Sequence, residues 1–140
     1  MIGQHCIRTW SNTQKSITLS SGEAELVAAV KTCTEVIGLS QLAHDWGIEL
    51  QCQVLVDSSA AIGVVHRRGN GRLRHIRVGL LWIQEKAEEE EIKVDKVAGE
   101  MNPADLMTKN LMQTKMDAHM SRLRQEYRSG RAHASLQLNT

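Results

Sequence analysis

The chain is poor in aromatic residues: its 140 residues include no Phe, one Tyr and three Trp. A surface that stacks successive single-stranded bases on aromatic rings is therefore excluded. Cysteine is also scarce, and Cys6, Cys33 and Cys52 form no C-x-x-C pair, which predicts reduced thiols rather than disulfides or a zinc site. The formal net charge is only +1, so any attraction to a polyanion must come from local patches.

Long hydrophobic runs are missing as well. No uninterrupted run of about 18 apolar residues occurs, and the start M-I-G-Q-H-C lacks the charged and then apolar pattern of a secretory signal. We therefore expect an intracellular chain, in the cytoplasm or the nucleus, that needs no membrane. A hydrophobic content of 41% over 140 residues is enough for one modest globular domain.

Patterns typical of strands and helices alternate along the chain. Ser20 and Glu23 have the S-x-x-E spacing of a capping box, and Gly47 is a plausible end of the helix that begins there. An apolar stripe follows at helical spacing, at Leu26, Val30, Cys33 and Ile37. The other expected elements are strands at 6–10, 54–56 and 92–97, helices at 58–65 and 75–89, and a last helix with Asn102 as N-cap and Pro103 as first residue. This order predicts an α/β fold.

Three acidic residues stand in distinctive sequence contexts: Glu25 in S-S-G-E-A-E-L, Asp57 in V-L-V-D-S-S-A-A and Asp105 in N-P-A-D-L-M-T-K. Strand ends and adjacent helix starts line the ligand crevice of an open α/β sheet, so the three carboxylates are candidates for one site. Such a site would need a hard cation such as Mg²⁺, and two ions could activate a water and stabilise a leaving oxygen of a phosphodiester.

Each acid also has a purely structural interpretation. Glu25 could be a first-turn acid favoured by the helix dipole. Asp57 could cap the helix that starts at Ser58, and Asp105 could be a capping group in the last helix.

A basic loop, R-R-G-N-G-R-L-R, precedes the second long helix. It concentrates potential phosphate donors at the start of that helix, namely Arg67, Arg68, Arg72, Arg74, His75 and Arg77. A solvated surface loop is the alternative.

These motifs together resemble the ribonuclease H segment of copia-type retrotransposon Pol polyproteins. The resemblance runs from about residue 8 to residue 111, through T-W-S-N-T-Q-K-S-I-T-L-S-S-G-E-A-E-L, V-D-S-S-A-A-I-G, R-L-R-H-I, W-I-Q-E and N-P-A-D-L-M-T-K. It implies that Glu25, Asp57 and Asp105 are catalytic metal ligands, that Glu23 is not catalytic, and that His75 is structural or contacts phosphate.

The implied activity is hydrolysis of the RNA strand of an RNA–DNA hybrid with Mg²⁺ or Mn²⁺. The hybrid would be recognised through its backbone shape and 2′-hydroxyls. No small-molecule cofactor is implied. The implied fold is a mixed sheet flanked by helices, in residues 1–113, followed by a polar tail at 114–140 that is either helical or disordered.

The family's first two strands, with a further ligand aspartate, would precede this chain, since nothing before Glu23 is acidic. Three hypotheses stay open, the most distant being a partner-dependent interaction module that offers its open sheet edge. An upstream reverse transcriptase or polyprotein segment completes an active nuclease with two metal ions. Alternatively, the chain is a degenerate, inactive fragment with weak nucleic-acid binding or partner-dependent folding.

Overall fold

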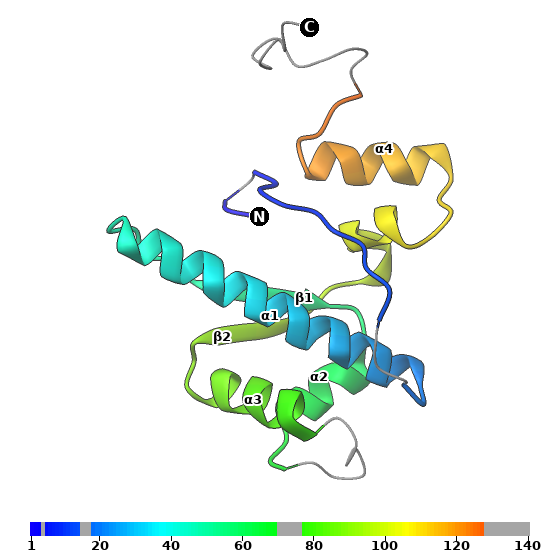
Figure 1. The fold of residues 1–140 in the computed structure, drawn as a ribbon. Coiled ribbons are helices and arrows are strands. Elements are labelled where there is room, and N and C mark those ends of the chain that lie inside the picture. The colour runs from blue at the N-terminus through cyan, green and yellow to red at the C-terminus, as the bar shows by residue number, and fades with distance from the viewer. Residues whose placement is uncertain (4, 15–17, 70–76, 128–140) are drawn as a thin grey trace, which may run out of the picture. The chain divides into compact units, whose positions relative to one another are not determined.

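The computed structural model describes residues 1–3, 5–14, 18–69 and 77–127, which form two compact units. Of the described residues, those within 12–102 form one unit, and those within 1–11 and 103–127 form the other. The elements, in chain order, are α1 (Ser21–Asp45), β1 (Cys52–Val56), α2 (Ser59–Val65), α3 (Arg77–Glu88), β2 (Ile92–Lys96), the 3₁₀ helices η2 (Gly99–Met101) and η3 (Pro103–Met107), and α4 (Gln113–Arg122) (Figure 1).

Helix α1 begins where the capping box predicts. The Ser20 side chain accepts a hydrogen bond from the Glu23 backbone N–H at 3.2 Å. The Glu23 carboxylate in turn accepts from the Leu19 N–H at 2.6 Å, one residue before the position expected of an ideal box. Two backbone donors at the helix start are thereby satisfied, and the buried Glu23 has a structural role.

The end of α1 is also as predicted. Gly47 has a φ of +75°, in the left-handed region that glycine adopts without a steric penalty. Its N–H donates to the His44 carbonyl at 2.8 Å, and the Ile48 N–H donates to the Ala43 carbonyl at 2.9 Å. This pair of bonds is the Schellman arrangement, which satisfies carbonyls at the end of the helix.

The described residues contain one sheet, formed by β1 and β2 alone. The strands are parallel, with Val54 opposite Val94, and α2 and α3 lie between them in the chain as the crossover that a parallel pair requires. The α/β class is confirmed. The expected mixed sheet is not seen in the described part, where the only pairing is parallel. The strand expected at 6–10 is wrong: these residues pair with no strand, and an isolated bridge joins Ile2 to His5.

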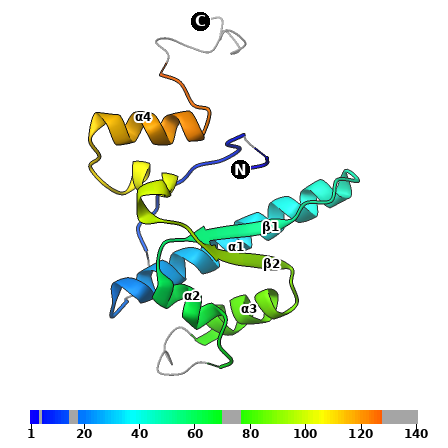
Figure 2. The ribbon, with the colours of Figure 1, turned by 180° about the vertical axis from the view of Figure 1, so that it is seen from behind.

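The core of the 12–102 unit lies on one face of this sheet. The inward side chains Val54, Val56, Ile92 and Val94 are buried, whereas Leu55 between them is 52% exposed. Figure 2 shows the opposite face, with β1 and β2 in front of α1. Large side chains from the helices complete the core, at Leu26, Cys33, Leu80 and Ile83.

Helix α1 is long and apolar enough to cross a membrane by length and composition. In this structure it is instead the central helix of its unit, with Leu26, Cys33 and Ile37 in the core as the predicted stripe requires. Its C-terminal end is less covered, since Leu42 is 46% exposed and Trp46 is 72% exposed.

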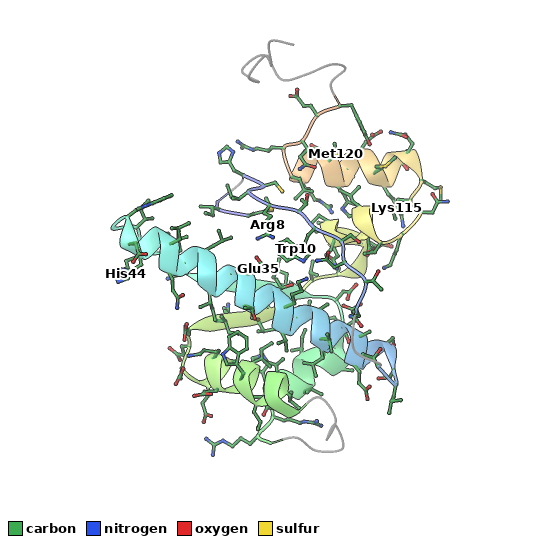
Figure 3. All side chains as sticks on the ribbon, in the orientation of Figure 1. Arg8, Trp10, Glu35, His44, Lys115 and Met120 are labelled. Atoms are coloured by element: carbon green, nitrogen blue, oxygen red, sulfur yellow. The ribbon has the colours of Figure 1, made fainter. Side chains whose placement is uncertain are left out.

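The second unit is described by itself. Helix η3 begins at Pro103 as predicted, although it is a 3₁₀ helix of five residues rather than an α-helix. His119 of helix α4 is buried, and so is Leu123, which caps the C-terminal end of the helix. In the N-terminal segment, the Arg8 guanidinium lies 5.5 Å from the ring centre of Trp10, and both side chains are labelled in Figure 3.

Candidate functional site

Asp57 lies at the carboxyl end of β1, in the bend that leads into α2. Its side chain is half-buried, and Oδ2 accepts a long hydrogen bond of 3.4 Å from the Asn102 amide. Asp57 does not cap α2, because the Ser58 hydroxyl accepts from the Ala61 N–H at 3.2 Å and so fills that role. The capping interpretation of Asp57 is therefore wrong, and its Oδ1 has no hydrogen-bond partner among the described residues.

Lys96 and Ser59 lie at the same carboxyl end of the two strands as Asp57. Lys96 is the last residue of β2 and lies opposite Val56 in the parallel register. The Val97 N–H donates to the Val56 carbonyl at 3.0 Å, so the two strands leave the sheet together. The Lys96 ammonium donates to the Ser59 hydroxyl at the start of α2. A carboxylate, an amide and an ammonium thus gather where ligands bind in parallel α/β sheets.

Sequence reasoning missed Lys96 and Asn102 as site residues. Lys96 lies near the end of the predicted strand at 92–97 and Asn102 follows that strand, so the signal was present in their position. Their relation to Asp57 depends on the parallel register of β1 and β2, which no local pattern specifies.

Glu25 is the fifth residue of α1 and is exposed. Its helix packs against β1 and α2, so Glu25 and Asp57 belong to the same unit. Within the described ranges, however, no three His, Cys, Asp or Glu side chains are grouped so that they could hold a metal ion. The ligand roles of Glu25, Asp57 and Asp105 stay predictions.

Asp105 belongs to the other unit and lies in η3. Its side chain is 13% exposed, and Oδ1 is 2.9 Å from the ammonium of Lys109 one turn later. The second oxygen, Oδ2, accepts from the same ammonium at 3.0 Å. This i,i+4 pair compensates the Asp105 charge locally.

The basic loop is described only in its first part. Arg67 and Arg68 follow α2 and are exposed, and the Arg68 guanidinium pairs with Glu88 at 2.8 Å. Both arginines line an open groove between α2 and α3 whose other lining residues include Glu85 and Glu88. Arg72, Arg74 and His75, together with the side chain of Arg77, lie outside the described residues.

The electrostatics of the 12–102 unit differ between core and surface. Burial raises the pKa of the Cys33 thiol from 9.0 to about 12, and a charge on Cys52 adds to the shift. On the open face of the sheet, a hydrogen bond from Gln53 and then the contact with Lys93 lower the pKa of the Asp95 carboxyl. The Cys33 shift arises from burial in the core, and the Asp95 shift arises from contacts on the open face of the sheet.

Comparison with known proteins places the chain in a retroelement context. It is similar to the retrovirus-related Pol polyprotein from transposon TNT 1-94 of Nicotiana tabacum, with 35% identity over 109 residues, or 76% of this chain. The chain spans 8% of the length of that polyprotein. No protein-family model matches, and no solved structure matches. The chain therefore has a homologous segment in a retrotransposon Pol polyprotein, which confirms the polyprotein part of the resemblance.

Proposed function

We propose that this chain is the ribonuclease H-like segment of a retrotransposon polyprotein and that it hydrolyses the RNA strand of RNA–DNA hybrids. The observation that carries the proposal is the placement of Asp57. Its half-buried carboxylate stands at the carboxyl end of a parallel strand, oriented by Asn102 and not used as a helix cap. A functional acid is expected in that place.

The sheet itself supports completion by further strands. An unpaired strand edge is normally protected by charged side chains. Strand β2 carries Lys93, Asp95 and Lys96, whereas β1 has no charged residue at all. We infer that a strand from an adjoining polyprotein segment pairs with β1 and stabilises the sheet that carries Asp57.

The donor set fits a hard cation in its chemistry. Mg²⁺ retains several waters and is bound through one or two carboxylates, so Asp57 and Glu25 would be its ligands in this unit. When bound, the ion would activate water and stabilise charge on the phosphodiester. Asn102 keeps one Asp57 oxygen oriented, which leaves Oδ1 as the oxygen for a ligand.

A degenerate fragment is the second candidate. The absence of a three-ligand acidic group among the described residues favours it, because hydrolysis would then have no complete metal site. Such a chain would bind a hybrid weakly through its basic residues and would leave the RNA intact.

The test is cleavage of an end-labelled RNA–DNA hybrid by the 140-residue chain in Mg²⁺, compared with Asp57→Asn. We expect the wild type to cleave and the variant to lose at least about 100-fold in rate, because a metal ligand is removed. Asp45→Asn is the matched control. Asp45 is an exposed acid at the C-terminal end of α1, far from Glu25 near the start of the helix, so this variant should leave the rate unchanged.

The outcomes separate the two candidates. Cleavage that persists in Asp57→Asn would reject the assigned site. A folded wild type that binds the hybrid without cutting it would support the degenerate fragment for this chain.

A further inference from the structure

A neutral group, the Ser59 hydroxyl, holds the ammonium of Lys96 at the end of the sheet that carries Asp57. The ammonium donates to this hydroxyl at the first residue of α2, two positions after Asp57. The register places Lys96 directly opposite Val56, so its backbone is level with the residue that precedes Asp57. The side chain thus connects the end of β2 with the start of α2.

Lys96 differs in its charge balance from other cations of the same unit. Lys93 pairs with Asp95 at 3.2 Å, Lys86 contacts Glu89 and Glu91, and Arg68 pairs with Glu88. No carboxylate lies within ion-pairing distance of Lys96 among the residues that the structure describes. A hydroxyl orients the ammonium without neutralising it, so the full positive charge is available to an anion.

We propose that Lys96 is a phosphate-binding residue of the nucleic-acid surface, contacting the backbone of the hybrid beside Asp57. Lysine suits this role as a compact charge with several donors, and phosphate contacts fix the register of a nucleic acid without reading its bases. Ser59 acts as a positioning residue, because its hydroxyl holds the Lys96 ammonium at the carboxyl end of the strands. The inference rests on the proposed function, since it takes the hybrid as the ligand.

The experiment measures equilibrium binding of an RNA–DNA hybrid of defined length to the full chain, over a salt series, with Ca²⁺ in place of Mg²⁺ to suppress cleavage. For Lys96→Gln we expect several-fold weaker binding at low salt and a log–log salt slope shallower by about one, as for the loss of one phosphate contact. Lys96→Arg should restore most of the affinity and the slope, because it keeps the charge.

Lys93→Gln is the matched control, because it removes the same charge from the same strand on the opposite face, where Asp95 already compensates it. It should leave the salt slope unchanged. Circular dichroism in urea shows whether each variant remains folded.

Equal slopes for Lys96→Gln and the wild type would overturn the inference, whatever the cleavage assay shows. If Lys96→Gln lowers the slope while neither chain cleaves in Mg²⁺, the phosphate contact stands and the nuclease proposal fails. A wild-type chain that does not bind the hybrid would reject both.

Discussion

Glu23 and Glu25 lie two positions apart in α1, and the fold gives them different surroundings. Glu23 is buried and its carboxylate accepts from the Leu19 N–H, so it belongs to the start of the helix. Glu25 is exposed on the same turn of helix. The S-x-x-E spacing identified the first role because capping is a local interaction, whereas a ligand role for Glu25 depends on groups from elsewhere in the chain.

At the residue scale, the buried thiol of Cys33 should make the free energy of unfolding fall as the pH rises through the alkaline range. The pKa of its thiol is raised from 9.0 to about 12, mainly by burial. Because the pKa is higher in the folded state, the contribution of the neutral thiol to the free energy of unfolding is complete below pH 9. It is lost as the pH rises toward 12, since the unfolded chain releases the proton first. We expect the free energy of unfolding to fall by about 1 kcal/mol between about pH 8 and pH 10 from this group.

Urea unfolding at both pH values measures this loss, with Cys33→Ala as the comparison. The variant has a lower stability at every pH because it leaves a cavity in the core, but it should lack the Cys33 part of the pH dependence. An identical pH dependence in both proteins would contradict the assignment.

At the element scale, the two ends of α1 are fixed by different chemistry, and two glycines test this. Gly47→Ala places a side chain at φ +75° and should lower the free energy of unfolding by about 1 kcal/mol. Gly38→Ala lies in the middle of α1, where no atom of the described residues is within 4 Å of the added Cβ, and it should raise the free energy by about 0.5–1 kcal/mol. Thermal melts of the two variants should therefore shift in opposite directions. A shift of the same sign would mean that the cap at Gly47 is not formed in solution.

The difference between local and long-range interactions explains which elements the sequence predicts. Helix α1, the short α2, strand β1 and the start of η3 at Pro103 follow from capping residues, apolar spacing and fixed φ, all of which are local. The expected strand at 6–10 failed because a strand requires a partner ladder, and its weak alternation carried no information about one.

The candidate site was predictable only in part. Asp57 could be located because it follows a recognisable strand. Lys96 and Asn102 could not be linked to it, since their proximity arises from the parallel register and from a segment that lies much later in the chain.

At the scale of the whole molecule, two parallel strands and their covering helices form the larger unit, and the second unit is described separately. Only one face of this two-stranded sheet is covered by helices, so the buried core is small for a chain of 140 residues. We therefore expect the isolated chain to unfold in urea with a free energy below about 5 kcal/mol, the lower end of the range for globular domains. Circular dichroism and tryptophan fluorescence would measure it, and a cooperative transition well above that value would contradict the proposed need for a completing strand.

The uncharged edge of β1 has a further consequence for how the protein is assembled. Backbone hydrogen bonds at a strand edge recognise extended shape rather than side-chain identity, so the edge discriminates little between one strand and another. Which strand pairs with the edge of β1 then depends on the concentration of each competing strand. A strand joined to this chain by a short peptide would be present at an effective concentration in the millimolar range, far above that of any free competitor. Covalent continuity within a polyprotein would thus provide the selectivity that the edge itself lacks.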